Sequence, residues 1–122
     1  MADISRILVV EDQPLLLLDL IDQLTERGFD TLSAGGARTA ARMLGSQIDA
    51  LVTDIELGSG PDGLVLARLA AQTRPGLPIV IVSGGVQPSS RQLPPGAVFL
   101  PKPCRVDDIV HALRAQRQSR AA

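Results

Sequence analysis

The sequence contains few aromatic and sulfur-containing residues. Among 122 residues there are two phenylalanines, no tryptophan, no tyrosine and one cysteine, Cys104. A single cysteine excludes an internal disulfide, and Cys104 has no partner of the zinc-site or Cys-x-x-Cys kind, so we interpret it as a small buried hydrophobe. Two aromatic rings leave little surface for stacking on nucleobases, and the core must be aliphatic.

The sequence also lacks an excess of positive charge and a long apolar run. Twelve Lys and Arg against 13 Asp and Glu give a net charge of −1. This balance argues against direct binding of nucleic acid or of a membrane surface, since both depend on clustered cations. No apolar run approaches the length that spans a bilayer, and no secretory leader is recognisable. We therefore expect a cytoplasmic protein.

What the sequence does contain is enough apolar material for a core of its own. It is 45% hydrophobic and 20% charged, which is typical of a globular domain. Its length fits a single domain over residues 1–122, with a core at about 5–117 and a frayed tail at 118–122. No linker, internal repeat or low-complexity segment interrupts it.

Short apolar runs alternate with segments of helical periodicity. We expect strands at residues 6–10, 31–33, 49–53, 78–82 and 97–100, and helices at 15–27, 34–44, 64–73 and 106–116. Such alternation predicts an α/β fold, a doubly wound parallel sheet with helices on both faces. Between the last two strands, residues 84–95 are rich in Pro, Gly and Ser, so a fourth helix there would be short or irregular, confined to 89–93.

Polar residues follow four of the expected strands. Glu11 and Asp12 come after the first, Asp54 after the third, Ser83 after the fourth and Lys102 after the fifth. In doubly wound sheets the functional site lies at the carboxyl ends of the strands, so these side chains should meet. Carboxylates brought together raise one another's pKa, and a divalent cation relieves that cost.

This residue set suits phosphoryl transfer assisted by a metal ion. Asp12 and Asp54 fit Mg²⁺, which uses few protein carboxylates and keeps several waters, and Glu11 could contribute through a water. Asp54 could also act as a nucleophile toward phosphorus. Lys102 would supply positive charge and Ser83 a hydroxyl donor to the incoming phosphoryl oxygens.

Four fragments in this order resemble the receiver domain of two-component response regulators, over residues 5–117. They are Val-Val-Glu-Asp at 9–12, Val-Thr-Asp at 52–54, Ile-Val-Ser-Gly at 81–84 and Phe-Leu-Pro-Lys-Pro at 99–103. The resemblance implies a flavodoxin-like (βα)5 sheet with strand order 2-1-3-4-5, here as a stand-alone domain.

For the site, the resemblance implies that Asp54 accepts a phosphoryl group from a phosphohistidine of a sensor histidine kinase or a histidine phosphotransfer protein. It implies Mg²⁺ as cofactor, with Mn²⁺ as a substitute, bound by Glu11, Asp12, Asp54 and the backbone carbonyl of Glu56. Apart from its own phosphorylation and dephosphorylation, such a chain would not be an enzyme.

The resemblance also implies a switch. Ser83 and Lys102 would contact the phosphoryl group, and Phe99 would turn inward as Ser83 moves. The bond between Lys102 and Pro103 would be cis. The output would be changed binding of an unidentified downstream protein, and the last strand and helix form a plausible face for homodimers.

Two segments depart from the family pattern. Residues 57–63, Leu-Gly-Ser-Gly-Pro-Asp-Gly, carry one residue more than the usual Met-Pro-x-Met-Asp-Gly loop. Residues 84–95 are similar to a receiver subgroup in which the helix after the fourth strand is short or mobile.

Two other functions stay open at this point. A pseudo-receiver would bind partners constitutively without phosphoryl transfer; the acidic pair, Asp54 and Lys102 argue against it. A flavodoxin-like binder or hydrolase of a small phosphorylated ligand would need a glycine-rich loop after the first strand, where Glu11 and Asp12 stand instead.

Overall fold

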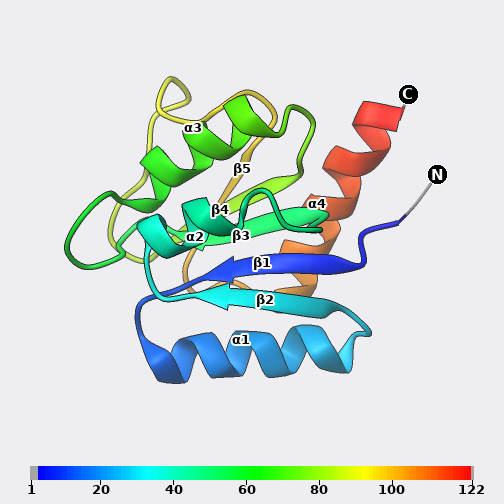
Figure 1. Ribbon diagram of the computed structural model, residues 1–122, viewed down its shortest axis with the longest axis horizontal. Coiled ribbons are helices and arrows are strands. Elements are labelled where there is room, and N and C mark those ends of the chain that lie inside the picture. Colours follow the sequence, from blue (N-terminus) through cyan, green and yellow to red (C-terminus); the bar gives the residue numbers. More distant parts are fainter. Residues whose placement is uncertain (1–2, 122) are drawn as a thin grey trace.

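The computed structural model describes residues 3–121, and for residues 118–121 the backbone alone. Five strands and four helices occupy this range and alternate except between the last two strands (Figure 1). In chain order they are β1 (Arg6–Val10), α1 (Pro14–Glu26), β2 (Asp30–Ala34), α2 (Ala37–Met43), β3 (Ala50–Asp54), α3 (Gly63–Thr73), β4 (Ile79–Ser83), β5 (Val98–Pro101) and α4 (Val106–Ala121).

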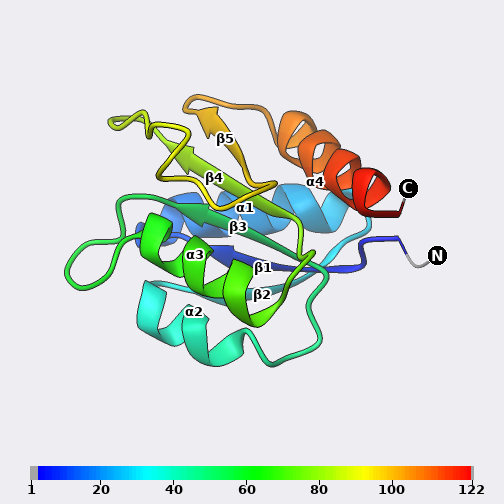
Figure 2. The ribbon, with the colours of Figure 1, turned by 90° about the horizontal axis from the view of Figure 1, so that it is seen from above.

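The strands form one parallel sheet in the order β2-β1-β3-β4-β5. Helices α1 and α4 cover one face of this sheet, and α2 and α3 cover the other (Figure 2). The flavodoxin-like fold and its strand order are therefore confirmed. Because all five strands are parallel, their carboxyl ends meet at one end of the sheet.

The core consists of two aliphatic layers that the alternation of strand side chains separates. In β1, Ile7 and Val9 join the layer beneath α1 and α4, whereas Leu8 and Val10 join the layer beneath α2 and α3. Successive strand residues point to opposite faces, so a strand covered on both faces must be apolar throughout. The buried run expected at residues 78–82 is confirmed, since every residue of β4 is buried.

The expected boundaries either match the observed ones, as for β1, or differ from them by up to five residues. Helix α2 begins at Ala37 because Ala34 still belongs to β2 and Gly36 is the N-cap. Helix α4 continues to Ala121 instead of ending at Gln116, so the backbone of residues 118–121 is helical, and Ala122 lies outside the described residues. No helix of the described range is long and apolar enough to cross a bilayer.

The segment between β4 and β5 contains no helix, and the short helix at 89–93 is absent. A turn occupies residues 90–92, with the Ser89 carbonyl accepting a hydrogen bond from the Gln92 amide at 3.0 Å. Pro88 and Pro94 bracket the turn, and proline disfavours helical backbone in the preceding residue.

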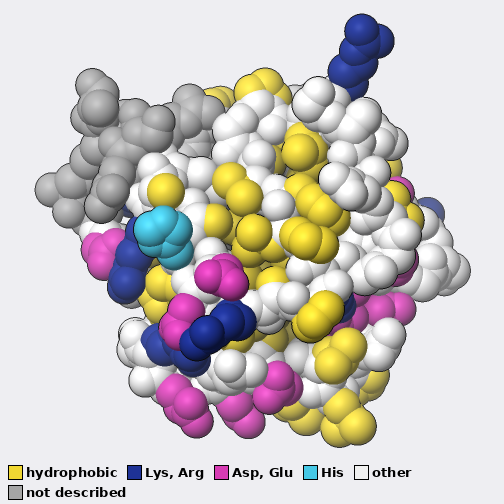
Figure 3. Space-filling model, turned by 180° about the vertical axis from the view of Figure 1, so that it is seen from behind, with side chains coloured by type: hydrophobic (Ala, Val, Ile, Leu, Met, Phe, Trp, Pro, Cys, Tyr) yellow, Lys and Arg dark blue, Asp and Glu magenta, His cyan; other side chains and the backbone are white. Residues whose placement is uncertain are grey.

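Because no helix lies here, β5 is less covered than β3 and β4. Its residues are half-buried or exposed, whereas every residue of β3 and β4 is buried. Hydrophobic side chains gather at the centre of the face that carries β5 (Figure 3).

Candidate functional site

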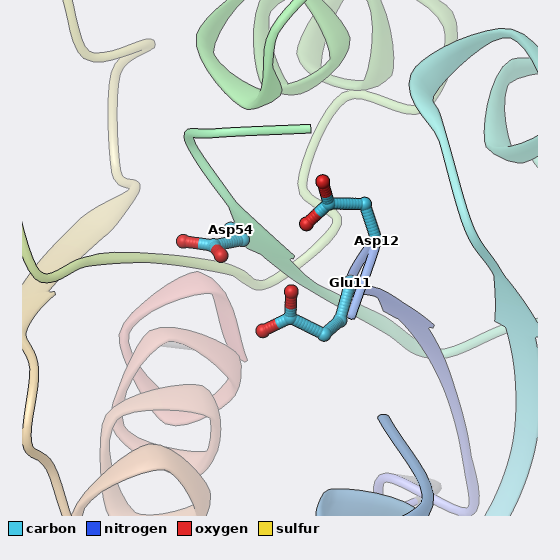
Figure 4. Close-up of side chains that lie close together, drawn as sticks. All are labelled: Glu11, Asp12 and Asp54. Atoms are coloured by element: carbon cyan, nitrogen blue, oxygen red, sulfur yellow. The ribbon is translucent and has the colours of Figure 1, made fainter. Parts of the chain in front are cut away.

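Three carboxyl groups converge at the carboxyl ends of β1 and β3. Val10 pairs with Thr53, which places Glu11 and Asp12 beside Asp54, the last residue of β3. One oxygen from each carboxyl group lies within 4.8 Å of the others (Figure 4). The structure thus brings together the three acidic side chains that the sequence analysis selected.

The three carboxyl groups differ in exposure. Glu11 and Asp54 are 5% and 4% exposed, whereas Asp12 lies at the surface. Burial raises the pKa of Asp54 from 3.8 to about 6, and the neighbouring charges of Glu11 and Glu56 act in the same direction against the hydrogen bond from Lys102. A buried carboxylate surrounded by like charges is a costly arrangement that structural stability alone does not favour.

Lys102 faces this acidic group from the end of β5. Its Nζ donates hydrogen bonds to Oε1 of Glu11 at 3.0 Å and to Oδ2 of Asp54 at 3.1 Å. Burial lowers the pKa of Lys102, but the bonds to Glu11 and Asp54 outweigh burial and raise it overall. The Lys102–Pro103 peptide bond is cis.

One oxygen of Asp54 has no hydrogen-bond partner. Oδ2 accepts the bond from Lys102, while Oδ1 is buried and unpartnered among the described residues. Buried carboxylate oxygens are normally satisfied, so an exception requires an explanation. The position and donor type fit a hard cation such as Mg²⁺, which prefers carboxylate oxygen. Glu11 is already bound to Lys102 and to the Gln13 amide, at 3.2 Å, so it suits an indirect contact through water.

Ser83 ends β4 one residue beyond Val82, the register partner of Asp54. It is 2% exposed, and its backbone carbonyl accepts the Lys102 amide at 2.8 Å. Its hydroxyl donates to the carboxylate of Glu56, with Oγ 2.9 Å from Oε1 and 2.8 Å from Oε2. Glu56 was expected to contribute its backbone carbonyl to the site, and the contact of its side chain with Ser83 was not expected. No signal in the sequence marks this contact, because it depends on where the Glu56 side chain turns after it leaves β3.

Phe99 is the selected residue that lies within the sheet and not at its end. It pairs with Ile81 in the middle of β5, and its half-buried ring packs against the core layer of α2 and α3. Its inward turn on phosphorylation stays a prediction.

The loop after β3 packs closely against the site. A Cβ atom on Gly63 would overlap the carbonyl oxygen of Asp54, so glycine alone fits at the start of α3. Asp62 caps this helix by accepting the Val65 amide at 3.0 Å. Gly58 has a φ of 71° and lies against Asp12, since a Cβ there would be 3.4 Å from Oδ2. The loop therefore approaches the acidic group directly at Gly58.

An apolar cavity of about 480 Å³ adjoins the site between α1 and α4. Its polar lining comprises Glu11, Asp54 and Lys102 of the site together with Asp19 and Gln23 of α1, and its apolar wall includes Leu16, Leu20, Val52, Val82, Val106 and Ile109. Cys104 also lines it; it is half-buried, less than the fully buried position expected from the sequence, and burial raises the pKa of its thiol. The sequence analysis did not anticipate this cavity.

Comparison with known proteins gives one consistent result. The family model described as "Response regulator receiver domain" matches residues 7–114. A response regulator receiver protein from Sinorhizobium medicae is 32% identical and superimposes with a TM-score of 0.87, covering 97% of this chain and 98% of that one.

Two curated relatives are bacterial transcriptional regulatory proteins. TcrA from Mycobacterium tuberculosis is 40% identical over 116 residues, 90% of this chain and 45% of its own length. AruR from Pseudomonas aeruginosa is 36% identical over 90 residues, 69% of this chain and 36% of its own length. The chain thus spans less than half the length of either relative.

Proposed function

Because the chain belongs to the response regulator receiver family, we propose that it accepts a phosphoryl group on Asp54. The donor would be the phosphohistidine of a sensor histidine kinase or of a phosphotransfer protein. The observation that carries this proposal is the buried Asp54 carboxylate, which has one oxygen bound to Lys102 and the other unpartnered. In the reaction a carboxylate oxygen of Asp54 bonds to phosphorus while the bond from phosphorus to the imidazole nitrogen breaks.

The charge of the site suits this step. When bound, Mg²⁺ would neutralise charge on the transferring phosphoryl group, and Asp12, Asp54, the Glu56 carbonyl and, through water, Glu11 would hold it. Lys102 stabilises the negative charge of the phosphoryl oxygens. A cation would also favour the ionised form of Asp54, the form that attacks, against the raised pKa.

The consequence of phosphorylation would be a change in partner binding. The added charge at Asp54 lies at the ends of β3 and β4, next to the helix-free segment 84–95. Ser83 and Phe99 would carry the change to this segment and to the exposed face of β5, where a downstream protein or a second copy of the chain would bind. We further propose that residues 5–117 form a complete receiver core.

Intact-mass measurement tests the proposal directly. With Mg²⁺ and acetyl phosphate, the protein should gain one phosphoryl group that is lost in base. Asp54→Asn should gain none, whereas Asp49→Asn, a matched change at the other end of β3, should gain as much as the unaltered protein. Phosphate uptake by Asp54→Asn would contradict the assignment, and no uptake by the unaltered protein would favour a constitutive interaction module.

The metal is tested separately with Mn²⁺, which is paramagnetic. Added Mn²⁺ should broaden the NMR amide signals of residues 11–12 and 54–58 first, and excess Mg²⁺ should restore them. Asp12→Asn should weaken both effects. Broadening that begins elsewhere in the protein would contradict the proposed ligand set.

A further inference from the structure

The hydroxyl of Ser83 has no free hydrogen-bonding capacity. Its single proton is shared between the two oxygens of Glu56, at 2.9 and 2.8 Å. Its oxygen accepts the amides of Gly85 at 3.1 Å and Val86 at 2.9 Å. A serine hydroxyl offers one donor and two acceptor positions, so all three are occupied. Ser83 cannot donate to a phosphoryl group on Asp54 until it releases Glu56.

Glu56 is placed to be released. Its residue is exposed, although the hydroxyl that it binds belongs to a residue 2% exposed. The carboxylate can therefore turn into water without leaving a cavity or an unsatisfied buried charge. A phosphoryl group on Asp54 would bring about −2 charge next to this carboxylate, and the repulsion would favour its departure.

We propose that Glu56 is a positioning residue that withholds the Ser83 hydroxyl from the phosphoryl group, so that phosphorylation must displace Glu56 before Ser83 can bind. This inference rests on the proposed phosphorylation of Asp54. In the resting state the Ser83 hydroxyl is bound to Glu56. After phosphorylation it would bind the phosphoryl group instead, and this exchange would move the backbone next to Ser83. Gly85 and Val86, bound to the same hydroxyl, would follow it into segment 84–95.

A double-mutant cycle tests the proposal with beryllofluoride, which becomes tetrahedral when it binds a carboxylate oxygen and then mimics an aspartyl-bound phosphoryl group. In the presence of Mg²⁺, Glu56→Ala should lower the dissociation constant of beryllofluoride about three- to tenfold, because the competing bond to a charged acceptor is gone. In a Ser83→Ala background the same change should have much less effect, since no hydroxyl remains to be released.

Three further variants separate the hydrogen bond from other causes. Glu56→Gln keeps a neutral acceptor, so its dissociation constant for beryllofluoride should lie between those of the unaltered protein and of Glu56→Ala. Glu26→Ala removes an exposed charge at the far end of α1 and should leave the dissociation constant unchanged. Ser83→Thr keeps the hydroxyl, so in this background Glu56→Ala should again tighten beryllofluoride binding. This control shows whether a packing defect explains the result in the Ser83→Ala background.

The outcomes distinguish this inference from the proposed function. If Glu56→Ala tightened beryllofluoride binding equally with and without Ser83, the cause would be a simple charge effect, and the inference alone would be overturned. The absence of any tightening would also overturn the inference. In the unphosphorylated protein, Glu56→Ala should shift the NMR amide signals of Gly85 and Val86 while Glu26→Ala should not; unshifted signals would also overturn it. Failure of every variant to bind beryllofluoride and to take up phosphate would overturn the proposed function, and the inference with it.

Discussion

The charged side chains at the two ends of the sheet differ in how fully they are hydrogen-bonded. At the amino end, the guanidinium of Arg74 donates to the carbonyls of Leu44, Ser46 and Ile48 at 2.9, 3.3 and 2.9 Å. Asp49 at the same end accepts the amides of Ser5 and Arg6, both at 2.9 Å. At the carboxyl end three carboxyl groups lie together, Lys102 pairs with two of them, Glu11 and Asp54, and Oδ1 of Asp54 has no partner among the described residues.

The pKa values of two aspartates on β3 or beside it express this difference. Burial raises the pKa of Asp49, but bonds from the amides of Arg6 and Ser5 outweigh burial and hold it below its ordinary value. Burial raises the pKa of Asp54 to about 6, and the single bond from Lys102 does not compensate. Charges at the amino end are thus matched within the chain, whereas those at the carboxyl end are left for a ligand to match. That is the physical mark of a site built for binding and not for stability.

The largest expected effect comes from removing the lysine that pairs with Glu11 and Asp54 at the carboxyl end. Lys102→Ala should lower the free energy of unfolding by about 3 kcal/mol at pH 8, because two buried carboxylates lose their counter-charge. The loss should shrink as pH falls from 8 through about 6, where Asp54 takes up a proton, and should be smaller at pH 5. Urea unfolding followed by circular dichroism measures this in a protein without tryptophan or tyrosine. Arg91→Ala, an exposed cation, is the control; equal losses at both pH values would contradict the explanation.

Asp54→Asn should stabilise the protein. The folded pKa of about 6 exceeds the ordinary 3.8, so the folded protein loses stability as pH rises from about 4 to 6. Asparagine avoids that loss and should raise the free energy of unfolding by about 2 kcal/mol at pH 8. The gain should disappear near pH 4. Destabilisation at pH 8 would show that the bond to Lys102 dominates instead.

At the amino end, Arg74→Ala should destabilise the protein by about 1.5 kcal/mol, because three carbonyl groups lose a charged donor. The loss should be the same at pH 5 and pH 8 and should leave phosphate uptake unchanged. Arg68→Ala, which removes one bond of 3.3 Å to the Gln92 carbonyl, should cost less in the same urea titration. A cost for Arg68→Ala equal to that of Arg74→Ala would contradict the role of the carbonyl bonds.

The smallest effect is expected for Asp49→Asn, about 1 kcal/mol of lost stability at pH 7. Its lowered folded pKa means that the contribution of Asp49 is present above about pH 4 and is lost as pH falls through the folded value. The difference between the variant and the unaltered protein should therefore vanish in acid, as it does for Asp54→Asn, but with the opposite sign. A variant as stable as the unaltered protein at pH 7 would show that the two amide bonds contribute nothing net.

Much of the site could be anticipated because it lies at strand ends. Glu11, Asp12, Asp54 and Lys102 follow recognisable apolar runs, and parallel strands bring such positions together. The partner of Ser83 could not be anticipated in this way, because it depends on where the Glu56 side chain turns after leaving β3. Helix ends were predicted least well, since the continuation of α4 past Gln116 follows no change in apolar spacing.

The order of apolar runs and helical segments was by itself sufficient to predict a parallel sheet covered on both faces and the end of that sheet where the charged residues gather, because side-chain periodicity decides which faces are buried. The strand order came from the resemblance to the receiver family. Tertiary structure alone decided how those charges are matched: the unpartnered oxygen of Asp54, its pKa near 6 and the hold of Glu56 on Ser83. These depend on burial and on distances of a few ångströms between residues far apart in the chain, and electrostatic free energies change steeply over such distances.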